Sequence, residues 1–167
     1  MSARPIDSRR AGPHGRPMVL VHASCVALEG KGVLLRGTTG AGKSDLALRL
    51  IEGGARLVAD DRVALTSNGE ALLAAPPARI AGLLEVRGIG IVSMEYLHRC
   101  PVHLAVDLVR PEAVERMPES ATVDLCGHRI AHVMLAPFEA SAPAKVRLAL
   151  SRTAAVGQPA LAERSAG

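Results

Sequence analysis

The stretch Gly37-Thr38-Thr39-Gly40-Ala41-Gly42-Lys43-Ser44 decides how this sequence folds. It matches the pattern of a phosphate-binding loop, in which a glycine and four further residues precede Gly-Lys-Ser or Gly-Lys-Thr. The apolar segment 32–36 before it predicts a strand, and the segment 44–52 after it predicts a helix that ends at Gly53-Gly54. In this setting backbone N–H groups of the loop and the helix N-terminus converge on one anion. The flanks therefore favour a nucleotide-phosphate site over a simple glycine-rich turn.

Two side chains of this loop have separate expected roles. The compact positive charge of Lys43 would reach the β- and γ-phosphates of the nucleotide, and the Ser44 hydroxyl would lie on a magnesium ion. The loop thus predicts a magnesium-bound nucleotide as the ligand.

The composition limits the class of protein. The 167 residues suggest one domain with a core of its own, and 49% of them are hydrophobic, but Tyr96 and Phe138 are the only aromatic residues. Stacking on nucleic-acid bases is therefore not the expected main function. The formal net charge of +4 owes much to arginines within the first 16 positions, which is typical of a tail and not of a binding surface.

The three cysteines are scattered and lack metal-ligand spacing. We therefore expect reduced thiols and a cytoplasmic protein. The sequence contains no long apolar run and no signal-peptide core, so no membrane association is expected.

Composition and periodicity divide the chain into three parts. Residues 1–17 are rich in Arg, Pro, Gly and Ser and predict a disordered segment, residues 18–155 predict the folded domain, and residues 156–167 predict a flexible tail. Extended segments are expected at 18–22, 25–28, 55–59 and 102–109, hairpins at 63–74 and 122–135, and a helix at 142–154.

The predicted strand 55–59 ends in two adjacent carboxylates, Asp60 and Asp61. Beside a nucleotide, such an acidic strand end can hold magnesium, position a nucleophile or take its proton. Adjacent strand residues point to opposite faces, so both carboxylates reach one ligand only if the strand ends or bends there. The alternative is a solvated turn, and Lys43, 17 residues upstream, favours the functional interpretation.

The hydrophobic run 83–92 carries Glu85, Arg87 and two glycines. Charges inside such a run are either gatekeepers of an edge strand or site residues, and the run by itself does not decide between these two interpretations. Four histidines of the domain show no ligand spacing with acids or cysteines and are expected to be surface or structural residues. They are His98, His103, His128 and His132.

Taken together, the loop at 37–44, the segment 56–61 and the segment Glu85-Val86-Arg87-Gly88-Ile89-Gly90-Ile91 resemble the catalytic domain of the bacterial HPr kinase/phosphorylase family in order and spacing. The third segment is similar to the signature of that family. His22, 21 residues before Lys43, resembles a histidine that the family uses. The resemblance covers about residues 18–150.

This resemblance implies an α/β fold, namely a P-loop kinase domain of the phosphoenolpyruvate carboxykinase-like type, with a mixed twisted sheet, hairpins and few helices. It implies ATP- and Mg²⁺-dependent phosphorylation of a serine of HPr, the small phosphocarrier of the sugar phosphotransferase system. Many family members also run the reverse phosphorolysis with inorganic phosphate. They are typically hexamers, so the resemblance implies a homo-oligomer.

The resemblance also implies roles for individual residues. Residues 37–44 would hold the nucleotide phosphates with Lys43 as a catalytic residue, and Ser44 with Glu85 would bind magnesium. The pair Asp60/Asp61 would supply the base that takes the serine proton, with the choice between the two left open.

The resemblance places two more catalytic residues near these. His22 would lie close to the acidic pair, and Arg87 would steady charge on the transferred phosphoryl group. Both roles suit phosphoryl transfer, which depends mainly on positioning and charge neutralisation.

The sequence departs from the family pattern in two respects. It resembles a short, alphaproteobacterial form without the N-terminal domain and the helical C-terminal extension of longer members, which leaves phosphorylase activity open. Where the family has Gly-Arg-Asn, this chain has Ala144-Lys145-Val146-Arg147. Lys145 is the predicted stand-in for the catalytic arginine, with Arg147 as the alternative, although lysine lacks the bidentate fork of arginine.

Two alternative functions remain on the same fold. One is a kinase of small molecules, because fold does not fix the substrate. The other is a non-catalytic module that senses ATP. The two acids Asp60 and Asp61, with Glu85 and Arg87, argue against the module, because binding alone needs no base.

Overall fold

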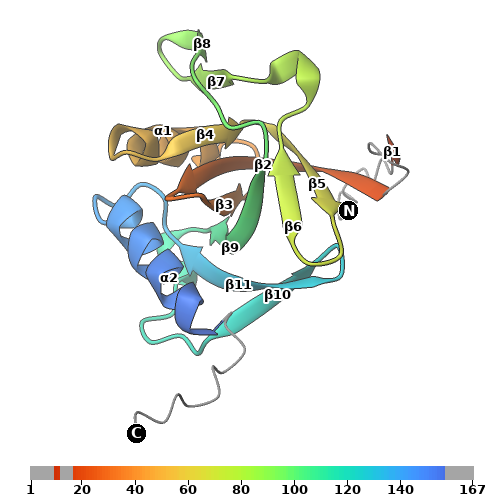
Figure 1. The fold of residues 1–167 in the computed structure, drawn as a ribbon. Coiled ribbons are helices and arrows are strands. Elements are labelled where there is room, and N and C mark those ends of the chain that lie inside the picture. The colour runs from red at the N-terminus through yellow and green to blue at the C-terminus, as the bar shows by residue number, and fades with distance from the viewer. Residues whose placement is uncertain (1–9, 12–16, 157–167) are drawn as a thin grey trace, which may run out of the picture.

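The computed structural model of the protein describes residues 10–11 and 17–156. Its strands are β1 Arg10–Ala11, β2 Pro17–Leu28, β3 Lys31–Arg36, β4 Arg56–Ala59, β5 Arg62–Ser67, β6 Leu72–Ala75, β7 Leu83–Val86, β8 Gly90–Ser93, β9 Cys100–Leu108, β10 Ala121–Leu125 and β11 His128–Leu135 (Figure 1). The α-helices are α1 Lys43–Glu52 and α2 Ala142–Val156, and the short 3₁₀ helices are η2 Ala78–Ile80 and η3 Pro111–Ala113. The expected α/β fold with hairpins and few helices is confirmed.

Five strands close into a ring. β2 pairs antiparallel with β3 and β5, β5 with β6, β6 with β9, and β9 returns in parallel to β3. The 12-residue strand β2 takes part twice, because residues 18–22 pair with β5 and residues 23–28 pair with β3. The two extended segments expected at 18–22 and 25–28 are therefore one strand.

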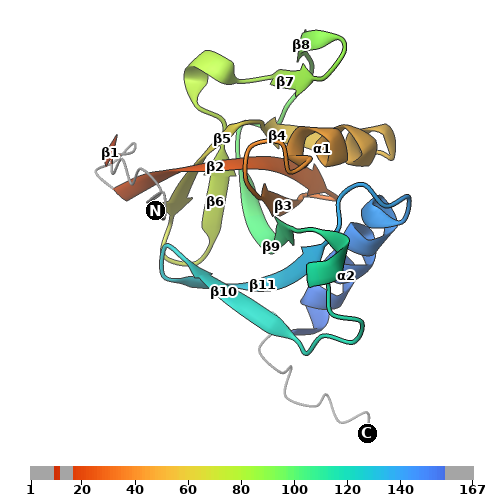
Figure 2. The ribbon, with the colours of Figure 1, turned by 180° about the vertical axis from the view of Figure 1, so that it is seen from behind.

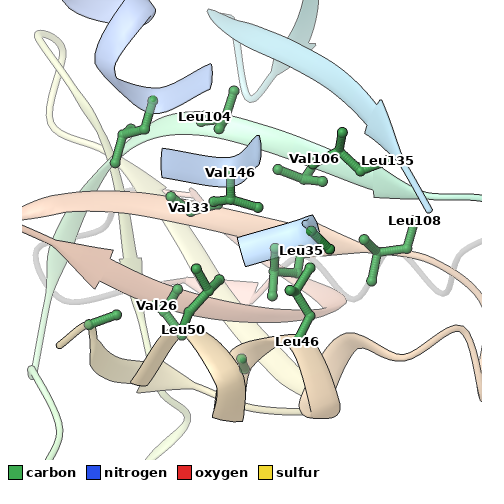
Figure 3. Close-up of a cluster of buried hydrophobic side chains, with 14 of the residues drawn as sticks. Val26, Val33, Leu35, Leu46, Leu50, Leu104, Val106, Leu108, Leu135 and Val146 are labelled. Atoms are coloured by element: carbon green, nitrogen blue, oxygen red, sulfur yellow. The ribbon is translucent and has the colours of Figure 1, made fainter. Parts of the chain in front are cut away.

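Two apolar clusters pack on the two sides of these strands. One joins buried apolar residues of all five ring strands, among them Cys25, Leu34, Leu65, Ala74 and Ala105. The other lies between the sheet and the two α-helices (Figure 3).

The helix-facing cluster explains why α1 and α2 form where they do. Leu46 and Leu50 lie one turn apart on α1 and are fully buried, and Val146 and Leu150 repeat this spacing on α2. They pack on alternate strand residues such as Val33 and Leu35, whose side chains appear in Figure 3. Each buried leucine contributes about 1.5–3 kcal/mol of transfer free energy.

The hairpin β7–β8 is a separate two-stranded sheet. It stands away from the ring at the top of Figures 1 and 2. Its base is held by the buried side chain of Leu84 and by the backbone bond from Met94 N to Gly82 O (2.8 Å). The hydrophobic run expected at 83–92 is thus a projecting hairpin with two exposed isoleucines at its tip, Ile89 and Ile91.

The expected domain ends fall close to the limits of the described residues. Within the segment expected to be disordered, Arg10–Ala11 pairs with Pro17 and Met18 at the start of β2, and the rest of residues 1–16 lies outside the described residues. Helix α2 continues to Val156, one residue past the expected end at 155, and the remainder of the tail is not described. Within the described ranges, no helix has the length and apolarity needed to cross a bilayer.

Candidate active site

The phosphate-binding loop joins β3 to α1. Gly40 and Gly42 have φ angles of 82° and 99°, which favour glycine, and Ala41 N donates to Thr38 O at 3.0 Å. Helix α1 begins at Lys43, and no side chain caps its first turn. Its first N–H groups therefore face the loop, as an anion site requires.

Lys43 is held over this loop. Only 7% of the residue is exposed, and its Nζ donates to the carbonyl oxygens of Gly37 (2.8 Å) and Thr38 (2.9 Å). Burial lowers the pKa of Lys43 from its ordinary value, and the charges of Asp61 and Asp60 partly offset this. The lysine thus places a cation at the position where phosphates would enter.

The acidic strand end bends sharply at Asp61. Arg62 N donates to Asp60 O at 2.7 Å, and Asp61 has a φ of 66°, so the three residues form a γ-turn of the positive-φ kind. Such a conformation costs a non-glycine residue about 1–3 kcal/mol. The turn separates the two carboxylates, because Asp60 is 4% exposed and the Asp61 side chain is 60% exposed.

The Asp60 carboxylate joins three parts of the fold. Its Oδ1 accepts hydrogen bonds from Ser24 Oγ on β2 (2.6 Å) and from Ser44 Oγ on α1 (2.8 Å). Its Oδ2 accepts one from the backbone N–H of Glu85 on β7 (3.1 Å). Asp60 therefore fixes the Ser44 hydroxyl and the start of the Glu85 segment relative to each other.

A cavity of about 440 Å³ lies between the loop, the acidic turn and the β7–β8 hairpin. It brings together most of the site residues predicted from sequence. The residues that line it are His22, Thr39, Gly40, Gly42, Lys43, Ser44, Asp45, Leu48, Asp61, Glu85, Val86, Arg87 and Phe138. His22 Nδ1 lies 3.8 Å from Asp61 Oδ1, so the histidine flanks the open acid.

Lys145 does not line this cavity. It lies in the first turn of α2, where its Nζ pairs with Glu139 Oε2 at 2.7 Å. Arg147 has a structural contact: its Nη2 donates to Leu50 O at 3.4 Å and packs beside Gly53, where a Cβ atom would lie 2.0 Å from Nη2. Arg147 thus binds the C-terminal end of α1.

Sequence reasoning missed three residues that shape the site. Ser24 is fully buried and bonds to Asp60, and Phe138 lies against Gly42 of the loop. Arg49 on α1 donates to the carbonyl oxygens of Pro137 and Glu139 and so holds the segment that carries Phe138. No local pattern marks Ser24 or Arg49, but the scarcity of aromatic residues could have drawn attention to Phe138.

Three partly buried side chains, from β3, β9 and β11, form a cluster next to the start of the loop. Arg36, the residue before Gly37, makes a bidentate pair with Asp107 on β9 (2.7 and 3.0 Å), and His132 Nε2 lies 2.8 Å from Asp107 Oδ2. Burial raises the pKa of Asp107, but the bonds and charges of Arg36 and His132 outweigh it and hold the pKa below its ordinary value. This cluster ties β3, β9 and β11 together.

The donor set suits a magnesium ion that arrives with a nucleotide. The Ser44 hydroxyl and the Glu85 carboxylate line one cavity and offer the oxygen atoms that magnesium prefers. Among the residues described, no group of three or more His, Cys, Asp or Glu side chains is placed to hold a metal by itself. Magnesium at nucleotide sites uses only one or two carboxylates and completes its shell with phosphates and water.

The fold and the site have the features of a phosphate-binding-loop domain with an acidic turn facing the loop. The family described as HPr Serine kinase C-terminal domain matches residues 16–136, and the chain belongs to this family. The resemblance stated from three sequence segments is confirmed.

Known relatives agree with this assignment. An HPr kinase/phosphorylase of Chloroherpeton thalassium is 36% identical over 126 residues, which are 68% of this chain and 37% of the relative. One from an Exiguobacterium species is 47% identical over 79 residues, or 47% of this chain and 25% of the relative. The chain thus spans well under half the length of these relatives. The solved structure of the Hpr(Ser) kinase/phosphatase from Coxiella burnetii has a TM-score of 0.71 and 26% identity, covering 82% of this chain and 96% of that chain.

Proposed function

We propose that this protein is a kinase that transfers the γ-phosphoryl group of ATP, with Mg²⁺, to a serine of the protein HPr. The observation that carries the proposal is a single cavity that joins the phosphate-binding loop with Lys43 to the open carboxylate of Asp61. The family membership and the names of the relatives support the substrate.

Asp61 acts as the base. Phosphoryl transfer needs a carboxylate that can reach the attacking hydroxyl, and of the adjacent acids only Asp61 lines the cavity. Asp61 takes the serine proton as the serine oxygen bonds to the γ-phosphorus and the bond to the β-phosphate oxygen breaks. His22, 3.8 Å from Asp61, orients this carboxylate.

The positive side chains stabilise the transferred group. Lys43 neutralises the charge that develops on the phosphate oxygens, and Arg87 of the β7–β8 hairpin, which lines the same cavity, adds a second positive charge. Ser44 and Glu85 would hold the magnesium ion, which would supply positive charge to neutralise the phosphates. Asp60 keeps both ligands in place through its bonds to Ser44 Oγ and Glu85 N.

The test is transfer of labelled γ-phosphate from ATP to purified HPr. Lys43→Ala should lower the rate at least 100-fold, because a preorganised charge at the transition state is lost. Lys31→Ala is the matched control, since Lys31 begins β3 and does not line the cavity. Transfer by Lys43→Ala at the rate of the unchanged protein would refute this mechanism.

The reverse reaction is a second candidate function, supported by the names kinase/phosphorylase and kinase/phosphatase of the relatives. Here phosphate attacks the phosphoserine phosphorus, pyrophosphate forms, and Asp61 returns the proton to the serine oxygen. Incubation of phosphorylated HPr with this protein and phosphate should release one pyrophosphate per serine freed. Serine release without pyrophosphate would exclude phosphorolysis.

Two further parts of the proposal concern partners and assembly. A screen of labelled ATP against HPr and small metabolites distinguishes the proposed kinase from a small-molecule kinase, and an ATP-sensing module would label neither. We also propose a cytoplasmic homo-oligomer, with a hexamer as the expected form. Light scattering should then give about six times the chain mass of 17.4 kDa.

A further inference from the structure

A second groove, of about 770 Å³, lies on the other side of the phosphate-binding loop. Its walls are the outer side of the loop, the end of β9 with η3, and the segment between β11 and α2. Among the residues that line it are Pro111, from the segment after β9, and Pro137 and Phe138, from the segment after β11. The proposed transfer chemistry uses none of the segments that follow β9 and β11.

The sheet topology relates this groove to the first cavity. The strand order here is β4, β2, β3, β9 and β11, and all except β2 run in the same direction. The loop follows the central strand β3, the acidic turn follows β4 on one side, and the groove follows β9 and β11 on the other side. Ligands of such sheets bind outside the carboxyl ends of the strands. An elongated ligand in the loop therefore has its reacting end toward β4 and its other end toward β9 and β11.

The groove is suited to a flat apolar ring. Phe138 is 70% exposed although it is apolar, and it lines both the groove and the first cavity. Pro111 and Pro137 add rigid apolar walls on the two flanking segments. Arg49 binds the carbonyl oxygens of Pro137 and Glu139, so the backbone that carries Phe138 is held against α1 beside the loop.

We propose that this groove binds the purine base of the nucleotide whose phosphates occupy the loop, with the base stacked on Phe138. This inference rests on the proposed function, because it requires a nucleotide as the phosphoryl donor. Stacking does not depend on the hydrogen-bonding edge of the base. ATP and GTP should therefore bind about equally, and both should bind more tightly than inorganic triphosphate.

The first experiment is calorimetry of the full chain with Mg²⁺ and either ATP or inorganic triphosphate. Phe138→Ala should weaken ATP binding roughly 10-fold and leave triphosphate binding unchanged, because a base stacked on an aromatic ring loses about that much on truncation. Leu148→Ala is the matched control: Leu148 is an apolar residue on α2 that is 65% exposed and lines neither cavity. An equal effect of Phe138→Ala on both ligands, or none on ATP, would overturn the inference.

The second experiment keeps a ring at the site. The chain has no tryptophan, so Phe138→Trp places a single tryptophan in the groove, which can be excited selectively over Tyr96. Its emission should change with ATP and with GTP but not with triphosphate, whereas Leu148→Trp should respond to none of them. An identical response of Phe138→Trp to ATP and to triphosphate would contradict base stacking.

These outcomes distinguish the two proposals. Suppose that triphosphate and ATP both bind and HPr is phosphorylated, but the Phe138 variants do not distinguish ATP from triphosphate. The groove inference then fails and the kinase proposal stands. If neither ligand binds the unchanged protein, both fail.

Discussion

Asp60 and Asp61 are consecutive residues whose carboxylates lie in opposite surroundings. The Asp60 carboxylate accepts three hydrogen bonds inside the protein, while that of Asp61 opens into the cavity beside the phosphate-binding loop. The γ-turn between Asp60 O and Arg62 N causes the separation. Asp60 is therefore tied into the fold, whereas Asp61 is open to the cavity, as the base of the proposed transfer must be.

Replacing Asp61 tests its proposed role as the base. Asp61→Asn removes the proton acceptor and should lower transfer to HPr by a factor of about 10²–10⁴. The thermal midpoint should change little, because asparagine tolerates the positive φ of 66° at this position. Kinetic assays and calorimetry on the same preparation separate the two effects, and a fully active Asp61→Asn enzyme would exclude Asp61 as the base.

Replacing Asp60 should, unlike replacing Asp61, destabilise the fold. Asp60→Asn replaces one carboxylate oxygen, which accepts hydrogen bonds, with an NH₂ group, which cannot accept them. At least one donor among Ser24 Oγ, Ser44 Oγ and Glu85 N then loses its acceptor. We expect a loss of about 1–3 kcal/mol of unfolding free energy. Urea denaturation measures it, with Glu119→Gln on the exposed connection before β10 as control. An unaltered denaturation midpoint would show that these bonds contribute nothing.

Two glycines of the loop allow a matched comparison. Gly40 and Gly42 both have positive φ. A Cβ atom built at Gly42 would lie 2.9 Å from Cζ of Phe138, whereas a Cβ atom built at Gly40 would have no atom of the described residues within 4 Å, its chain neighbours aside. Gly40→Ala should cost about 1–2 kcal/mol of backbone strain. Gly42→Ala should cost more and should also displace Phe138, which triphosphate and ATP titrations would detect. Equal losses for the two variants would mean that the Phe138 contact has no energetic weight.

The Asp107 cluster predicts a pH-dependent term in stability. In the folded protein the pKa of Asp107 is lower than the ordinary 3.8, so folding favours the charged carboxylate. This contribution to stability is fully present above pH 3.8 and is lost as the pH falls through the folded pKa. Asp107→Asn should cost roughly 2 kcal/mol at neutral pH.

The difference between Asp107→Asn and the unchanged protein should narrow below pH 3.8, which denaturation at several pH values measures. Arg36→Lys keeps the charge but loses the bidentate fork, so an intermediate loss is expected. A constant difference down to acid pH would show that the Asp107 charge is not responsible.

Local patterns predicted the elements of this fold well, but not how they associate. The loop, α1 and the hairpins at 63–74 and 122–135 carry their own signals in glycines, turns and periodicity. The closed ring does not, because β9 pairs with β3 and β6 over long sequence separations that no local pattern encodes.

The same distinction holds for the site. Lys43, Ser44 and Asp61 stand in motifs, and they line one cavity as the spacing suggested. The different surroundings of the two acids could not be predicted, since they depend on one backbone hydrogen bond, from Arg62 N to Asp60 O. The Arg36–Asp107–His132 cluster was missed because its members are 71 and 25 residues apart and meet only through strand register.

The closed ring also has a consequence for how the molecule opens. Strand β3 has β2 on one edge and β9 on the other, so its amides are hydrogen-bonded within the centre of the sheet. In hydrogen exchange such amides are released mainly by global unfolding, whereas the projecting β7–β8 hairpin can exchange through local opening. The phosphate-binding loop is therefore attached to the slowest-exchanging part of the chain, while one wall of its cavity is free to fluctuate.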